Sequence, residues 1–164
     1  MKVWADRPPE VAALLNPAFC SLLVSVALDE YIGNAEDGAP YPFPFIMLPL
    51  VLHKPTRQMF PRTTRTTFSA WITKPDTATG KIGFPERAKN LNRYVKEALI
   101  FGILNGKIQL SDTGLLKPVT SSPKSFPKAT PEVNECIRAA KMCGKWFSLT
   151  GDLKTAMALL GVRP

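Results

Sequence analysis

The sequence predicts a mainly α-helical fold: a compact helical domain with one small β-hairpin and a C-terminal pair of helices. The apolar residues recur at helical spacing in several long segments. Two short apolar segments flank the turn sequence Ser-Asp-Thr-Gly, a pattern typical of a hairpin. A hydrophobic content of 45% and a mean hydropathy of −0.01 are typical of a globular protein. The 16 prolines, about twice the ordinary usage, divide the chain into short elements.

The first elements are predicted to be helices. Asp6 and the prolines after it start a short helix that extends through Leu15. Asn16-Pro17 then begins a second helix, from Ala18 to about Ile32, which is apolar nearly all round. A helix without a polar face belongs at the centre of a fold. Residues 33–40 form an acidic loop rich in turn-forming residues.

A third helix is predicted over residues 44–53, in the segment PFIMLPLVLH. Pro49 lies inside this helix and is expected to kink or interrupt it. The segment is so apolar that we expect part of its surface to remain uncovered in the isolated chain. Such an exposed apolar area would mark a partner interface.

The middle of the chain is less regular. The segment FSAWI has the threonine-rich and aromatic surroundings of a strand, but Phe68, Trp71 and Ile72 have helical spacing, and we predict a helix. Residues 75–83 are expected to form a loop. A long helix from Pro85 to about Gly106 follows, and a hairpin comes directly after it. A helix followed by a hairpin is typical of a winged-helix-like element.

The C-terminal part begins with residues 121–130, a linker rich in proline and lysine. Thr130 caps a helix that starts at Pro131, and Thr150-Gly151 interrupts it. Asp152 caps a last helix, which ends at Gly161. The expected organisation is a helical domain over residues 1–120, the linker over 121–130, and a C-terminal helical pair over 131–164 that packs on the domain.

The positive charge of the chain is concentrated in its middle third. Residues 54–96 hold 10 Lys/Arg and 2 Asp/Glu, whereas residues 1–53 hold 2 and 6. The net charge is +8. Such asymmetry favours a nucleic acid or an acidic protein as a partner, although a solvated basic face without a partner has the same composition.

The most basic stretch is LHKPTRQMFPRTTRTTF, residues 52–68, which contains the only histidine and no acidic residue. Lys54, Arg57, Arg62 and Arg65 alternate with threonines. Arginine with hydroxyl donors suits phosphate oxygens, and the same arginines suit carboxylates of a partner protein. A second basic group, Lys89, Arg93 and Lys96, lines one face of the long helix or serves only as its solvated side.

Catalytic patterns are weak. His53 has no Cys or Asp near it in sequence, and we expect it to interact with the last carbonyls of its helix. The sequence ATGKIG lacks the first glycine and the Ser or Thr of a phosphate-binding loop. No GxSxG nucleophile motif is present. We therefore predict no enzyme, no cofactor and no metal site.

The three cysteines and the apolar N-terminal segment indicate the compartment. Cys20, Cys136 and Cys143 match no zinc spacing and are expected to be buried, reduced thiols. Residues 11–28 carry no charge, but Asn16-Pro17 interrupts them, and the apolar remainder is too short to span a bilayer. The sequence predicts a cytoplasmic protein that does not enter the membrane.

The order of several blocks resembles a known family. These blocks are LNPAFC, PYPFPFIMLPLVLHKPTRQMFP, FSAWI, ERAKNLNRYVKEALIFGILNGKIQL and KMCGKWFS followed by TAMALLGVRP. Together they resemble the middle component of bacterial three-component ABC systems, the group that includes Lamassu-type defence. The resemblance extends from about Asn16 to Pro164. The matching motifs are structural, so no catalytic residue is carried over.

The resemblance implies a non-enzymatic subunit that bridges an SMC-like ABC ATPase and an effector, often a nuclease, in antiviral or antiplasmid defence. The ATPase of such systems responds to foreign DNA, so this chain would contact DNA directly or through the ATPase. Residues 52–68 would then form a docking surface. The alternative is a free-standing winged-helix DNA-binding regulator.

Overall fold

The computed structural model describes residues 13–162, except 36, 124, 151 and 152. It confirms a mainly helical fold with a small antiparallel sheet and helices at the C-terminal end. The predicted helix over residues 6–15 and the predicted cap at Asp152 lie largely or wholly outside the described residues. Residues 13–15 of that helix are described: Ala13 and Leu14 are helical, and Leu15 is in a turn.

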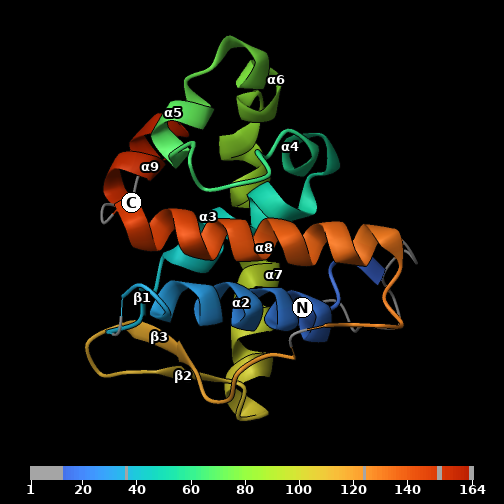
Figure 1. The fold of residues 1–164 in the computed structure, drawn as a ribbon. Coiled ribbons are helices and arrows are strands. Elements are labelled where there is room, and N and C mark those ends of the chain that lie inside the picture. Colours follow the sequence, from blue (N-terminus) through green and yellow to red (C-terminus); the bar gives the residue numbers. More distant parts are fainter. Residues whose placement is uncertain (1–12, 36, 124, 151–152, 163–164) are drawn as a thin grey trace.

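Two long helices form the centre of the fold. Helix α2 spans Pro17–Ile32, and the Asn16 side chain caps it by accepting a hydrogen bond from the Ala18 amide at 2.8 Å. Helix α8, Pro131–Thr150, lies alongside α2 and runs in the same direction (Figure 1). Gly144 allows the two backbones to approach, because a Cβ at this position would lie 2.9 Å from Glu30 Cβ. This packing places α2 at the centre of the fold, as its sequence predicted.

Helices α3, Phe43–Leu52, and α7, Phe84–Leu104, complete the main body. Helix α7 passes behind α2 and α8 in Figure 1 and reaches from one end of the molecule to the other. Helix α3 continues past Pro49 without a break, and every residue in it except Phe45 is buried. The expected exposed apolar surface on this segment is therefore confined to Phe45, because α2, α7 and α8 cover the rest.

Short helices surround the basic segment. Helix α4, Lys54–Gln58, begins directly after the extended residue His53, in a segment for which the sequence predicted no helix. Pro55 explains the difference, since proline is compatible with the first turn of a helix. Helix α5, Phe68–Ile72, confirms the predicted helix at FSAWI. The predicted loop over residues 75–83 instead contains a 3₁₀ turn, Pro75–Thr77, and helix α6, Ala78–Lys81.

Helix α9, Leu153–Leu159, packs against α5. A cluster of aromatic rings joins α5 to α8. Trp71 and Trp146 have ring centroids 5.2 Å apart, and Phe60 and Phe68 pack on both. The buried core therefore continues from α2 through this cluster to α9.

The predicted hairpin is present as β2, Ile108–Leu110, and β3, Leu115–Pro118. A third strand, β1, Ala39–Pro40, pairs antiparallel with β3, so the strand order is β1-β3-β2. Sequence patterns did not predict β1, because two residues including a proline show no alternation. Gly114 adopts φ +78° in the turn between β2 and β3, a conformation that favours glycine.

Candidate functional site

The exposed part of the basic segment is a loop between α4 and α5. Arg62 and Arg65 are exposed in this loop, and Lys54 is exposed at the start of α4. Phe60 and Phe68 are buried at the two ends of the loop, and Trp146 donates a hydrogen bond from Nε1 to the Thr66 carbonyl at 2.8 Å. The core therefore holds this loop in place while its two guanidinium groups face solvent.

Arg57 does not belong to this exposed set. The sequence predicted that it would face a partner, but its side chain is only 1% exposed. Its Nη2 donates to Glu132 Oε1 at 2.6 Å, its Nε donates to Glu135 Oε2 at 3.4 Å, and its Nη1 donates to the Leu52 carbonyl at 3.2 Å. The physical reason is the position of α8: its first turns bring two carboxylates over α4. Arg57 thus connects α4, α8 and the end of α3.

His53 also has a structural role, because it contacts a buried side chain of the same chain. It was expected to contact the last carbonyls of its helix, but its Nδ1 lies 2.6 Å from the hydroxyl of the buried Thr56. That hydroxyl also lies 3.3 Å from the Gly80 carbonyl, which links α4 to α6. Desolvation lowers the pKa of His53 below its usual value of 6.5, and the positive charges of Arg87 and Arg57 lower it further. His53 therefore takes up a proton less readily than a solvent-exposed histidine.

The second basic group lies on the solvent side of α7. Lys89, Arg93 and Lys96 are all exposed. Arg93 stacks over the ring of Tyr94 with its guanidinium carbon 4.5 Å from the ring centroid, and it donates a hydrogen bond to the Tyr94 hydroxyl. No ion pair holds Lys89 or Lys96 within the described part of the chain.

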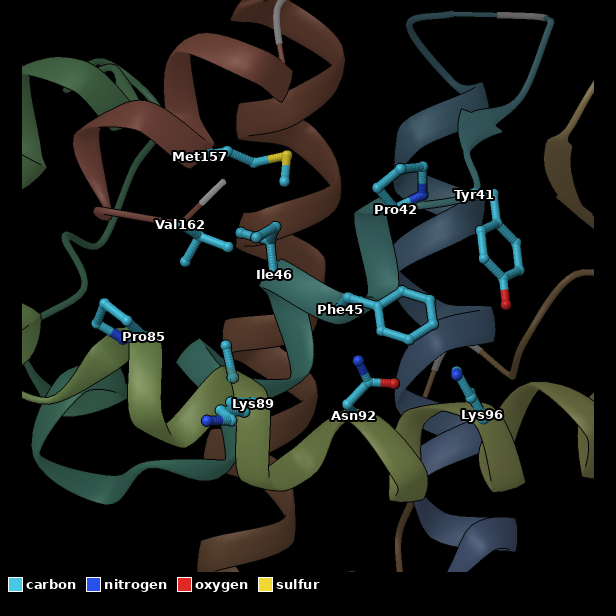
Figure 2. Close-up of a pocket in the computed structure, with 11 residues that line it drawn as sticks. Tyr41, Pro42, Phe45, Ile46, Pro85, Lys89, Asn92, Lys96, Met157 and Val162 are labelled. Atoms are coloured by element: carbon cyan, nitrogen blue, oxygen red, sulfur yellow. The ribbon is translucent and has the colours of Figure 1, made fainter. Parts of the chain in front are cut away.

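Lys89 and Lys96 form one edge of a groove of about 470 Å³, which we call the α3–α7–α9 groove (Figure 2). Three parts of the chain build it: the start of α3, the first half of α7, and α9 with the residues after it. Figure 2 shows Phe45 of α3 beside Asn92 and Lys96 of α7, and Met157 and Val162 on the α9 side. The lining consists of Tyr41, Pro42, Phe45, Ile46, Pro85, Ala88, Lys89, Asn92, Lys96, Met157 and Val162.

Sequence patterns did not predict this groove, because its lining comes from three separate segments.

A second exposed surface, at the end of α7, can be recognised in the sequence. The last turns of α7 read ALIFGIL, which is apolar on every face, whereas the buried stripe needs only Ala98, Leu99 and Gly102. The remaining side chains form an exposed apolar end of α7, with exposed fractions of 58%, 39%, 39% and 80% for Ile100, Phe101, Ile103 and Leu104.

The three cysteines are buried and free, as predicted. Burial raises the pKa of Cys20 to about 12, with smaller contributions from Cys136 and Glu97, and burial likewise raises the pKa of Cys143. Among the residues that the structure describes, no group of three or more His, Cys, Asp or Glu side chains is placed to hold a metal ion. None of the described helices combines the length and the apolar character that a membrane span requires.

A comparison with protein families identifies one match. The family described as "ABC-three component (ABC-3C) system Middle Component 3" matches residues 4–164, nearly the whole chain. No curated protein and no solved structure matches this sequence.

Proposed function

This chain belongs to the Middle Component 3 family of ABC-three component systems, and on that basis we propose that it is a non-enzymatic bridging subunit. Its two partners would be an SMC-like ABC ATPase and an effector, which in Lamassu-type defence is often a nuclease. The assembly would act in the bacterial cytoplasm against phage or plasmid DNA. The DNA would be contacted by the ATPase, by this chain, or by both.

The observation that carries this proposal is the presence of two separate exposed surfaces on one long helix. The first half of α7 forms the edge of the α3–α7–α9 groove, and its last turns form the exposed apolar end. A rise of about 1.5 Å per residue puts Leu104 about 22 Å from Lys89 along the helix axis. Two surfaces at this separation can be occupied by different partners at once, which is what a bridging subunit requires.

The first test is co-purification. A tagged copy of this chain is expressed with the ATPase and effector of the same system, and the eluate is analysed by size exclusion at about 50 and 500 mM salt. We expect one complex that contains all three proteins and persists at high salt, since apolar contacts are not screened by ions. Elution of this chain alone under both conditions would exclude the bridging role.

A matched pair of double variants tests the exposed apolar end of α7. Ile100→Gln with Leu104→Gln removes two exposed apolar side chains without a change in charge. Ile82→Gln with Leu149→Gln makes the same substitutions elsewhere, at side chains that are 71% and 60% exposed. We expect the first variant to lower the recovery of one partner at least tenfold, because a polar side chain in an apolar interface loses its hydration without a new hydrogen bond. The second should leave the complex intact.

The exposed basic loop gives a further test of the same proposal. Arg62→Glu with Arg65→Glu reverses two charges on the surface, and Arg57 is left unchanged because it is buried and paired. If the loop meets an acidic surface of a partner, this variant should weaken the complex, most strongly at low salt. Equal recovery of wild type and variant would remove the loop from the interface.

A second candidate function is direct DNA binding by a winged-helix element. The sheet order β1-β3-β2, with α7 directly before the β2–β3 hairpin, supports this candidate. In such an element α7 would enter the major groove, and its exposed Lys89, Arg93 and Lys96 would face the DNA. This function requires that the isolated chain bind a duplex with a steep salt dependence.

The DNA candidate is tested with the isolated protein. Wild type and the triple variant Lys89→Glu, Arg93→Glu, Lys96→Glu are titrated with a duplex between 50 and about 200 mM salt. Loss of phosphate contacts should reduce the slope of log affinity against log salt by about 1 for each contact. A wild-type chain that binds no duplex even at 50 mM salt would exclude this candidate.

A further inference from the structure

The α3–α7–α9 groove combines an apolar floor with a basic edge. Phe45 from α3 and Met157 and Val162 from the α9 side give the floor its apolar character (Figure 2). Lys89 and Lys96 stand on the α7 side, together with the amide of Asn92. The described part of the chain gives neither lysine an acidic partner and gives the Asn92 amide no hydrogen bond.

The chemistry of this lining selects the kind of occupant. Apolar walls suit side chains such as Leu or Phe, and they offer little to the sugar-phosphate backbone of a nucleic acid. Ammonium groups beside an apolar surface attract carboxylates, and they disfavour a basic partner. The side-chain amide of an asparagine both donates and accepts, so it can pair with the peptide backbone of a bound segment.

We propose that the α3–α7–α9 groove receives an acidic segment of a partner protein, with apolar side chains packed on Phe45 and Met157. The carboxylates of this segment pair with Lys89 and Lys96. The inference rests on the proposed bridging function, because it assigns the groove to the ATPase or the effector of the same complex.

The spacing of the two lysines predicts the pattern of the bound segment. Lys89 and Lys96 are separated by about 10 Å along the axis of α7, from a rise of about 1.5 Å per residue. An extended chain covers the same distance in about three residues. The expected segment therefore carries two Asp or Glu residues about three positions apart, with one or two large apolar residues next to them.

The first experiment compares matched variants of the full chain, each co-expressed with the two other components of its system. Asn92→Trp fills the groove with a large side chain, and Asn90→Trp places the same side chain on an exposed neighbouring position that does not line it. Lys89→Glu with Lys96→Glu reverses the basic edge, and Lys74→Glu with Lys117→Glu makes the same charge change at exposed residues outside the groove. Far-ultraviolet circular dichroism of each variant checks that the fold is retained.

We expect both groove variants to lower the recovery of one component at least tenfold, while the two control variants retain it. Normal recovery with the groove variants would overturn this inference and leave the bridging function intact. Equal losses in groove and control variants would show a response to net charge or bulk, which also overturns it. Failure of the wild-type chain to recover either component would overturn both proposals.

The second experiment identifies the occupant chemically. A carbodiimide joins a lysine amine to a carboxylate within contact distance by forming an amide bond with the loss of one water. Treatment of the wild-type complex, followed by digestion and mass spectrometry, should link Lys89 or Lys96 to an acidic and apolar segment of the ATPase or effector. Links from these lysines only to carboxylates of this chain or of a second copy would overturn the inference. Protection of both lysines by DNA, with no link to protein, would also overturn it.

Discussion

The buried guanidinium of Arg57 connects three helices, α3, α4 and α8. This guanidinium lies between the carbonyl end of α3 and two carboxylates in the first turns of α8. Arg138 of α8 in turn donates to the Arg57 carbonyl at 3.4 Å. Because Arg57 has this many partners within the chain, its role is structural. The proposed basic surface of residues 52–68 is therefore reduced to Lys54, Arg62 and Arg65, which are exposed.

We predict that Arg57→Ala lowers the free energy of unfolding by about 2–4 kcal/mol. The substitution removes a large buried side chain and leaves the Leu52 carbonyl at the end of α3 without its donor. Urea unfolding followed by circular dichroism measures the effect. Arg62→Ala, at an exposed position, should change stability by less than about 0.5 kcal/mol. Equal effects of the two substitutions would contradict the structural role of Arg57.

The environment of His53 predicts how stability depends on pH. Its pKa in the folded protein lies below 6.5, the value in the unfolded chain, because of desolvation and the charges of Arg87 and Arg57. Between these two pKa values the unfolded chain binds more protons than the folded one. The contribution of His53 to stability is therefore fully present above pH 6.5 and is lost as the pH falls towards the folded-state pKa.

We expect the urea midpoint of the wild-type chain to fall between pH 7.5 and pH 5, and His53→Gln to show a smaller fall. Glutamine does not titrate and can still form a hydrogen bond with Thr56. The difference between the two pH profiles isolates the histidine from the carboxylates, which titrate in both proteins. Parallel profiles would show that His53 titrates equally in the folded and unfolded states.

At the scale of helices, Gly144 controls the approach of α2 and α8. A Cβ at this position would collide with the Ala27 carbonyl oxygen and would lie 2.9 Å from Glu30 Cβ. A backbone atom inside a packed helix cannot move aside alone. Gly80 provides a matched comparison, because the nearest obstacle to its Cβ is the terminal methyl group of Met59, 2.7 Å away on a flexible side chain.

We predict that Gly144→Ala lowers the free energy of unfolding by about 1–3 kcal/mol, despite the higher helix propensity of alanine. Gly80→Ala should cost less than half as much, since the Met59 side chain can adopt another rotamer. Thermal and urea unfolding of both variants test the pair. A neutral Gly144→Ala would mean that α2 and α8 separate easily, which would contradict their central role in the fold.

The sequence predicted the elements that depend on local patterns. Asn16-Pro17 and Thr130-Pro131 are helix starts whose capping residues are visible in the sequence, and both helices begin there. Strand β1 and helix α4 were missed for the opposite reason. The two residues of β1 pair only because β3 lies beside them, and the five-residue helix α4 is held by contacts of Thr56 with α6 and of Arg57 with α8.

The residues of the candidate sites were likewise predicted where the sequence signal is local, and missed where the contacts are distant in sequence. Lys89, Arg93 and Lys96 were placed on one helix face by their spacing, and they lie exposed on α7. The burial of Arg57 could not be predicted, because its partners are far away in sequence, on α8. The groove likewise brings together residues from three separate segments, and only the folded chain shows that an apolar floor lies beside the lysines.

At the scale of the whole molecule, we ask whether the parts before and after residues 121–130 fold independently of each other. The sequence of this segment predicted a linker between a helical domain and a C-terminal pair. However, α8 packs along α2, its Trp146 enters the aromatic cluster with Phe60, and Glu132 pairs with Arg57. These contacts lead us to propose that residues 131–162 complete the core and do not form a separate folding unit.

A specific cut in the linker tests this proposal. We insert a protease recognition sequence between Ser125 and Phe126 and cleave the purified protein under native conditions. We expect the two fragments to elute together with an unchanged helical spectrum, because the contacts of α8 with α2 and α3 do not depend on chain continuity. The cleaved protein should unfold at lower urea than the uncut one, and its midpoint should rise with protein concentration, since unfolding now releases two chains. Fragments that separate without denaturant and remain helical would show two independent units, whereas co-elution with a concentration-dependent midpoint would show that the helices on both sides of the linker form one cooperative core.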